Sequence, residues 1–220
     1  AIAMKQRVSA ETWAAEMMCR GVKTEGAVFG AFDVGVHVGE KPEDRSQKPE
    51  GELWLGIDFG YANPFVCLWI FAGEDGVYVL DEYVKSERTI DEHLKAIGGR
   101  EWGKVSQVAC DPAGGGRNEQ TARSNVELIR RAGYRVHTRG SRIVDGVEKI
   151  RAQLKNADGA VRLRIHPRCH RLIRAMQEYR YGNQGSELPV KDGEHDHLID
   201  ALRYFFVNWD SAGKLQGKRY

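Results

Sequence analysis

Two aspartates of this chain end hydrophobic segments, where an ionised carboxylate is unusual. Asp58 closes the segment 53–57, and Asp111 follows the predicted buried strand 105–110. A carboxylate with apolar neighbours is costly unless it is solvated, accepts hydrogen bonds or faces a cation. We therefore expect Asp58 and Asp111 to face a cation.

A further pair of carboxylates lies in the segment 194–209, whose apolar residues recur at helical spacing. Asp196 and Asp200 are four residues apart, so they share one helix face, and His197 lies three residues before Asp200. Two carboxylates at this spacing repel each other weakly in an isolated helix, and a cation would reverse that sign. We expect this helix face to meet the same cation as the strand-end aspartates.

Carboxylates that converge from separate elements suggest a particular chemistry. Magnesium prefers hard oxygen ligands and is commonly held by one or two carboxylates together with substrate phosphate oxygens. Paired ions roughly 3.5–4 Å apart can activate a water and stabilise the leaving oxygen of an in-line displacement at phosphorus. The pattern therefore predicts a site for two divalent cations, Mg²⁺ or Mn²⁺, that hydrolyses phosphodiesters.

The elements that must position these residues can be read from apolar periodicity and turn residues. Short glycine-rich turns between apolar runs predict an antiparallel meander of three strands over 52–59, 64–72 and 77–84. Thr89 and Glu92 have capping-box spacing for a helix. The pattern then predicts strands 105–110, 134–138 and 161–165, helices 90–101, 119–132, 143–157, 168–178 and 194–209, and a β-hairpin over 179–191. The fold class is α/β, a mixed sheet flanked by helices with an extra hairpin before the last helix.

Residues 1–50 are predicted to be an N-terminal appendage and linker. Ser9 could open a short helix over 11–18, and 41–50 is polar and bounded by prolines. We therefore place a boundary near residue 51, with one main domain over 51–220.

Composition narrows the class of protein. The 220 residues are 41% hydrophobic and 29% charged, which is ordinary for a globular protein. The longest apolar runs are about ten residues, short of the roughly 20 that span a bilayer. The four cysteines show no CxxC spacing, so neither a disulfide framework nor a zinc ribbon is indicated. We expect a soluble intracellular protein with reduced, mostly buried cysteines and no membrane partner.

The charge is divided along the chain. Residues 1–101 hold 11 Lys and Arg against 18 Asp and Glu, and residues 102–220 hold 22 against 13. Sixteen of the 22 are arginine, the residue best suited to bidentate phosphate contact. The basic second half is either a solvated surface or a nucleic-acid contact.

Three motifs together resemble a known family. The stretch 56–60 (GIDFG) with Pro64, the stretch 108–113 (VACDPA) and the stretch 196–204 (DHLIDALRY) resemble the three nuclease motifs of the large terminase subunit of tailed bacteriophages. The resemblance covers about residues 51–210 and implies a ribonuclease H-like fold. It also implies an endonuclease without strong sequence specificity that cuts concatemeric double-stranded viral DNA during genome packaging.

The resemblance also implies roles for single residues. Asp58 would bridge both ions, Asp111 would complete the ligation of one ion and Asp200 that of the other. Asp196 or His197 would be an auxiliary ligand or a supporting group.

Partners follow from the same resemblance. The implied partners are double-stranded DNA, the packaging ATPase domain, the portal and the small terminase subunit. The implied location of the protein is the host cytoplasm and, transiently, the portal vertex of the procapsid. The predicted hairpin falls where such nucleases carry one near the DNA groove. The candidate phosphate contacts are basic residues of the second half, namely Arg117, Arg162, Arg164, Arg168, Arg171, Arg174, Arg180 and Lys191.

Other functions remain open on the sequence. Another ribonuclease H-like nuclease, such as a Holliday junction resolvase, would prefer four-way junctions. A non-catalytic DNA-binding or docking module would bind DNA without cutting it. The GIDFG stretch also resembles the first phosphate motif of actin-like and sugar-kinase ATPases, but Thr or Ser is missing soon after Gly60.

Two weaker motifs favour no separate site. The glycine-rich loop 112–117 lacks the GK[ST] ending of a Walker motif, so a flexible active-site loop is the better interpretation. His166, Cys169 and His170 match no closed zinc site, because a fourth ligand is missing.

Overall fold

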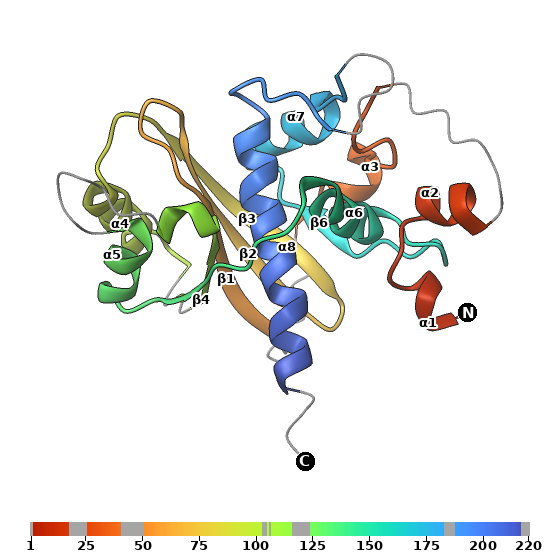
Figure 1. Cartoon of the computed structure of the whole chain (residues 1–220), viewed down its shortest axis with the longest axis horizontal. Helices are drawn as coiled ribbons and strands as arrows, with labels where there is room; N and C mark the ends of the chain where they lie inside the picture. The colour runs from red at the N-terminus through yellow and green to blue at the C-terminus, as the bar shows by residue number, and fades with distance from the viewer. Residues whose placement is uncertain are drawn as a thin grey trace.

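The protein is built on one mixed six-stranded sheet (Figure 1). A computed structural model describes residues 2–17, 26–40, 51–102, 105, 107–115, 124–182 and 188–216. The strand order is β5-β4-β1-β2-β3-β6. The strands are β1 (Gly51–Asp58), β2 (Phe65–Gly73), β3 (Gly76–Lys85), β4 (Gln107–Cys110), β5 (Arg135–His137) and β6 (Leu163–Ile165).

The directions of the strands confirm the predicted sheet. β1, β2 and β3 form an antiparallel meander, while β4 is parallel to β1, β5 to β4, and β6 to β3. The arms of the predicted hairpin also pair, because Tyr181 forms an antiparallel bridge with Pro189 and the Val190 N–H donates to the Arg180 carbonyl (3.0 Å). The tip, residues 183–187, lies outside the described residues.

Helices cover both faces of the sheet (Figure 1). The first face packs against α6 (Ile143–Leu154), α7 (His170–Glu178) and α8 (Asp196–Gln216), and the second against α4 (Ile90–Gly98) and α5 (Asn125–Arg131). The shorter helices are α1 (Ile2–Lys5), α2 (Ala10–Thr12), the π-helix η1 (Trp13–Met17), α3 (Val34–His37) and the 3₁₀-helix η2 (Pro112–Gly115).

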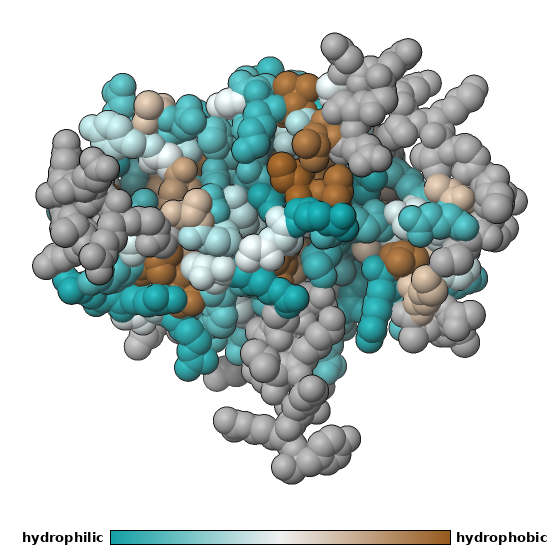
Figure 2. All heavy atoms as spheres, in the orientation of Figure 1, coloured by the Kyte–Doolittle hydropathy of each residue, from teal (hydrophilic) through white to brown (hydrophobic). Residues whose placement is uncertain are grey.

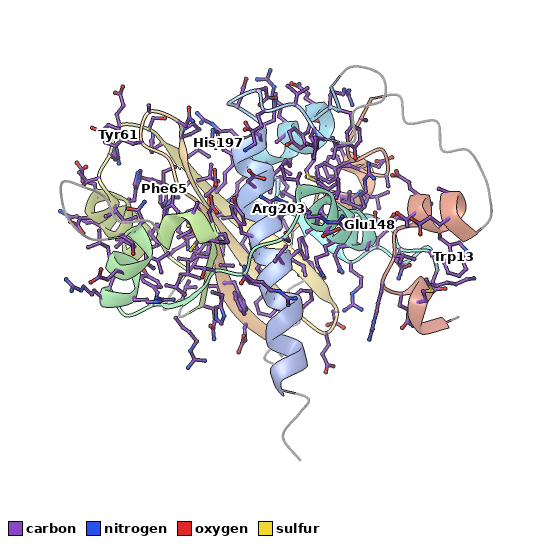
Figure 3. All side chains as sticks on the ribbon, viewed as in Figure 1. Trp13, Tyr61, Phe65, Glu148, His197 and Arg203 are labelled. Carbon is purple, nitrogen blue, oxygen red and sulfur yellow. The ribbon has the colours of Figure 1, made fainter. Side chains whose placement is uncertain are left out.

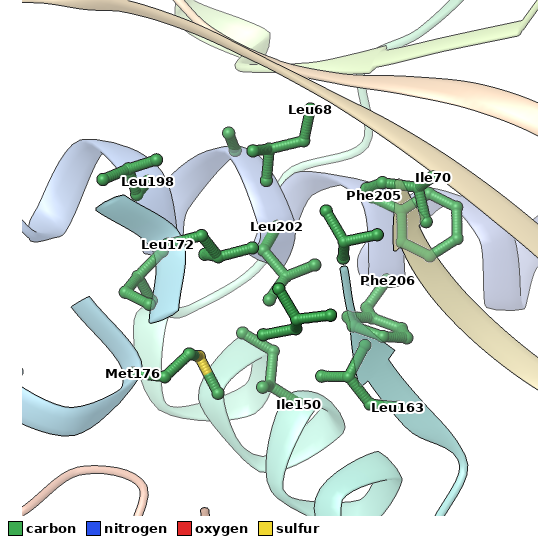
Figure 4. Close-up of a cluster of buried hydrophobic side chains, with 14 of the residues drawn as sticks. Leu68, Ile70, Ile150, Leu163, Leu172, Met176, Leu198, Leu202, Phe205 and Phe206 are labelled. Atoms are coloured by element: carbon green, nitrogen blue, oxygen red, sulfur yellow. The ribbon is translucent and has the colours of Figure 1, made fainter. Parts of the chain in front are cut away.

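The core on the first face is a dense layer of aliphatic and aromatic side chains (Figure 4). Leu202 and Phe205 of α8 lie between Leu68 and Ile70 of β2 on one side and Ile150 of α6 on the other. All five side chains are fully buried. At about 25 cal/mol per Å² of apolar surface removed from water, this layer is the main force that holds α8 against the sheet.

The first helical turns agree with the sequence in some places and differ in others. Thr89 and Glu92 form the predicted capping box of α4, and Ser124 caps α5. Helix α7 begins at His170, so Pro167 precedes the helix instead of occupying its first turn. Cys169 supplies no side-chain cap there.

A distant side chain supplies the missing cap of α7. Glu82 of β3 accepts hydrogen bonds from the backbone N–H groups of Arg171 and Leu172, both at 2.9 Å. A carboxylate at a helix N-terminus accepts hydrogen bonds from the free N–H groups there. Its negative charge is also attracted to the positive end of the helix dipole. The start of α7 is therefore fixed by β3, which no local pattern could show.

Part of the N-terminal segment packs into the same core. Val28 and Phe29 are buried in the cluster that contains α6, α7 and α8. Val38 forms a parallel bridge with Ile165, on the outer edge of β6, and the Ser9 N–H donates to Glu148 of α6 (Figure 3). The predicted helix over 11–18 is instead the short α2 followed by η1. The boundary near residue 51 stays a prediction, and the linker 41–50 lies outside the described residues.

The surface around α8 is mostly hydrophilic, with a few apolar patches (Figure 2). Large exposed apolar side chains in the described residues include Tyr61, Leu188 and Val190. None of the described helices is long and apolar enough to cross a membrane.

One contact sets the distance between α8 and the sheet. A Cβ on Gly56 of β1 would lie 2.7 Å from the Ala201 carbonyl oxygen and 3.2 Å from Ile70 Cδ1. Only a residue without a side chain lets the backbone of α8 come this close to β1.

We expect Gly56→Ala to push α8 away from β1 and to lower the free energy of unfolding by about 1–3 kcal/mol, the usual range for overpacking. Chemical denaturation measures this change. The matched control is Gly98→Ala, because a Cβ there has no atom within 4 Å. Equal stability of the two variants would contradict the proposed close contact.

Candidate active site

Asp58 and Asp111 lie side by side at one end of the sheet. β1 and β4 are parallel and Ile57 pairs with Cys110, so the residues that follow occupy neighbouring positions. Adjacent strands are about 4.8 Å apart. Because strand residues alternate between faces, both aspartates lie on the face opposite to Ile57 and Cys110, which is the face that α8 covers.

Asp200 reaches the same place from α8. It precedes Ala201, whose carbonyl oxygen rests on Gly56, two residues before Asp58. Asp58 and Asp200 are both buried, at 5% and 9% exposed. The structure therefore brings the three predicted aspartates together from two strands and one helix.

His197 holds Asp58 directly. Its Nδ1 lies 2.8 Å from Asp58 Oδ2, and the two side chains are 13% and 8% exposed (Figure 3). The other ring nitrogen, Nε2, is buried and has no hydrogen-bond partner in the described part of the chain. A buried nitrogen without a partner is costly, so Nε2 is suited to a ligand or a water that enters the site.

Asp196 plays a different part from His197. Its Oδ1 accepts the Gly193 N–H (2.8 Å), which ties the preceding loop to the first residue of α8. Asp196 is buried and lies one residue from His197, but of these two side chains it is His197 that holds Asp58.

The charges in the site oppose one another. Burial raises the pKa of Asp58 to about 6, the hydrogen bond from His197 opposes this rise, and the charges of Asp200 and Asp111 add to it. The hydrogen bond to Asp58 raises the pKa of His197 in turn, and burial raises the pKa of Asp196. Carboxylates that repel one another in a buried place are stabilised by a cation.

The donor set fits divalent cations that are shared with a substrate. Within the described ranges, no group of three or more His, Cys, Asp or Glu side chains is arranged to hold one ion by itself. Magnesium commonly takes only one or two carboxylates and completes its shell with water and phosphate oxygens. Asp58, Asp111 and Asp200, together with the unpartnered His197 Nε2, offer such an incomplete oxygen-rich set.

One neighbour of the candidate site, Arg203, lies within the motif 196–204 but was given no role by the sequence analysis. Arg203 Nε donates to Asp200 Oδ1 at 3.0 Å, and both side chains are buried. The spacing of three residues on one helix was a signal for this pair, since residues at i and i+3 are neighbours.

A cavity of about 550 Å³ opens near the same end of the sheet. Asp58 pairs with Val66 and Val66 pairs with Val84, so Val84 and Pro64 in the cavity wall lie two strands or fewer from Asp58. Basic residues of α7 and the loop before α8 also line it, namely His170, Arg171, Arg174 and His195, beside the acidic Glu194. The cavity is thus a mainly basic space next to the acidic site.

The other candidate DNA contacts are spread over the molecule. Arg162 donates to the Glu74 carbonyl and Arg164 to the Val36 carbonyl, both at 2.7 Å, and Arg164 pairs with Tyr78. These two arginines lie toward the end of β3 that is far from Asp58.

Arg168 forms an ion pair with Glu101 and lies over the Trp102 ring, whereas Arg180 and Lys191 are exposed on the hairpin arms. Arg117 lies outside the described residues.

Local contacts hold Tyr181, Cys169 and His166. Tyr181, on one arm of the hairpin, does not project from the body: it packs against the core, and its hydroxyl accepts a hydrogen bond from Arg151 (3.0 Å). Cys169 is buried with its Sγ 3.9 Å from the Val79 carbonyl, and His166 Nδ1 accepts the Arg168 N–H. These contacts account for both residues without a metal.

The mixed six-stranded sheet with helices on both faces has a ribonuclease H-like fold. The chain belongs to the terminase RNaseH-like domain family, whose model matches residues 55–208.

Single relatives agree with this family. The large terminase subunit of Escherichia phage T5 is 28% identical over 191 residues, which cover 82% of this chain and 41% of that protein. The chain therefore spans about two fifths of the length of this relative.

Among solved structures, the P22 large terminase nuclease domain superposes with a TM-score of 0.65 at 19% identity, covering 83% of this chain and 91% of that one. The large terminase nuclease of the thermophilic phage G20c, with bound magnesium, has a TM-score of 0.56 at 17% identity and covers 84% and 98%. At these identities the two structures show that the fold is shared.

We expect Mn²⁺ to raise the thermal stability of the wild-type chain, because a cation relieves the repulsion among Asp58, Asp111 and Asp200. Binding to the folded state alone adds about 2.7 kcal/mol at a concentration of 100 Kd. Thermal denaturation with Mn²⁺ and with EDTA measures the difference. Asp58→Asn should lose most of this gain, whereas Asp145→Asn, an exposed carboxylate on α6, should keep it. A gain of the same size in Asp58→Asn would place the ion elsewhere.

Proposed function

We propose that this chain is a metal-dependent endonuclease that cuts concatemeric double-stranded viral DNA without strong sequence specificity during genome packaging. The observation that carries the proposal is the convergence of Asp58, Asp111 and Asp200 at one sheet end in a terminase RNaseH-like domain. The magnesium in the G20c nuclease supports a divalent cation here.

The chemistry is hydrolysis of a phosphodiester. Two divalent cations, when bound, would supply an activated water and stabilise the leaving oxygen. In the proposed arrangement Asp58 would contact both ions, Asp111 would complete the ligation of one and Asp200 that of the other. In the hydrolysis the water oxygen bonds to phosphorus and the bond from phosphorus to the leaving oxygen breaks. One proton of the water ends on the leaving oxygen, and the other goes to the new phosphate or to solvent.

His197 is the auxiliary group that the geometry favours over Asp196. It already holds Asp58 by Nδ1, which fixes the orientation of that carboxylate, and its Nε2 is open toward a further partner. Asp196 instead holds the loop before α8 through the Gly193 N–H.

We propose that DNA approaches through the basic cavity beside the site. Arg171 and Arg174 line it, and the neighbouring hairpin arms carry Arg180 and Lys191. Arg174 is paired with Glu178 and Glu194, so a phosphate would replace carboxylate partners there. Such contacts position the backbone and read no bases.

The wider setting is proposed from the family. The chain would act beside a packaging ATPase domain, a portal and a small terminase subunit, in the host cytoplasm and transiently at the portal vertex of the procapsid.

Plasmid cleavage tests the central proposal. With Mg²⁺ or Mn²⁺ the wild-type chain should convert supercoiled plasmid to nicked and linear forms, and EDTA should stop this. Asp58→Asn and Asp200→Asn should each lose more than about 100-fold, since even groups that only support metal ligands contribute 10–100-fold. The control Asp145→Asn should cut like the wild type. DNA binding without cutting in any metal would favour the docking-module alternative, and selective cutting of four-way junctions would favour a resolvase.

DNA binding at several salt concentrations tests the proposed path. Arg171→Ala should weaken binding to a linear duplex and reduce the salt slope by about 0.9, the value for one lost phosphate contact. Fluorescence anisotropy in the Asp58→Asn background avoids cleavage. Arg162→Ala is the matched control, because that guanidinium lies at the other end of β3. Equal losses in both variants would show that the cavity has no special part in binding.

A further inference from the structure

Arg203 is a buried cation beside a candidate metal ligand. Its side chain is 6% exposed, its Nε–H donates to Asp200 Oδ1 at 3.0 Å, and NH1 lies 3.5 Å from the Ser141 hydroxyl. The guanidinium also lies over the Tyr204 ring, 4.5 Å from its centroid. These contacts hold the guanidinium between α8 and the start of α6 (Figure 3).

Helix α6 leaves space for this side chain. A Cβ on Gly146 would lie 2.2 Å from Arg203 Cγ and 2.5 Å from Cδ, and these atoms are in the middle of the side chain, where movement also displaces the guanidinium. The φ of Gly146 is not in the left-handed region, so the backbone does not require glycine. Glycine weakens a helix relative to alanine. The close contact with the Arg203 side chain therefore explains why a glycine stands at position 146 of α6.

The hydrogen bond leaves Asp200 in a defined state. One oxygen, Oδ1, accepts the Nε–H of Arg203, and this hydrogen bond restricts the rotation of the carboxylate. The position of the second oxygen is restricted with it. A lysine ammonium is a point charge without a rigid planar group, so it would compensate the charge and restrict the carboxylate less.

We propose that Arg203 is a positioning residue that orients Asp200 for a divalent cation and that Gly146 is the gap through which it reaches Asp200. This inference rests on the proposed metal-dependent function. It predicts that Arg203 and Gly146 affect the affinity for the metal ion as well as folding, although Gly146 lies outside the carboxylate cluster.

The test is Mn²⁺ binding to the full 220-residue chain by isothermal titration calorimetry. Arg203→Gln should weaken Mn²⁺ affinity by about 10–100-fold, the range for groups that support a metal ligand. Arg203→Lys should recover only part of this loss. Arg142→Gln is the matched control, because it removes an exposed arginine that pairs with a carboxylate three residues away, Asp145. This variant should bind Mn²⁺ like the wild type.

Gly146→Ala extends the test from α6. It should weaken Mn²⁺ binding in the wild-type background, because the new methyl group displaces Arg203. It should have no such effect in an Arg203→Ala background, where the crowded atoms are gone. Plasmid cleavage should recover in Arg203→Gln at raised Mn²⁺, as expected for weakened metal binding in a folded protein.

The outcomes separate the two proposals. If the wild type binds no Mn²⁺ and does not cut, the proposed function fails. If the wild type binds Mn²⁺ and folded Arg203→Gln or Arg203→Lys binds it equally well, the positioning role is overturned. If Arg203→Gln does not fold, Arg203→Lys and Gly146→Ala decide the question, and unchanged affinity in both overturns the proposal.

Discussion

The candidate site depends on holding like charges close together in a largely buried place. Asp58, Asp111 and Asp200 are brought together by two parallel strands and a helix that touches the sheet at a glycine. A buried carboxylate next to others is unfavourable by itself. The apolar layer between α8, α6 and the sheet holds the carboxylates in place. Folding thus stores a repulsion that a bound cation can release.

Two of the three crowded carboxylates have a partner from α8. His197 holds Asp58 and Arg203 holds Asp200, six residues apart on one helix. The helix therefore carries a candidate ligand and the groups that hold candidate ligands, so its distance from β1 affects all of them together. This explains how a backbone contact at Gly56 can matter for Asp58, two residues away.

Local patterns were enough for much of this fold. Alternating apolar residues and short glycine turns predicted the meander, and Thr89 with Glu92 predicted a capping box that is present. The features that the sequence analysis did not predict depend on contacts between distant segments. Glu82 caps α7 across 89 residues, and Arg203 meets Gly146 across two helices. The aspartates were found because a carboxylate at the end of an apolar run is a local signal. Arg203 lies within the third motif, 196–204, but the motif alone assigned it no role.

The residues that pack into the core begin earlier in the chain than the residues that match the family. The family match begins at residue 55, yet Val28 and Phe29 fill space under α6 and α7, and Val38 pairs with the outer edge of β6. An uncovered edge strand offers unpaired backbone groups to other chains. A chain shortened to the matched residues would expose both an apolar hollow and a sheet edge. The segment before the matched residues thus covers surface that would otherwise be open to contact between two copies of the domain.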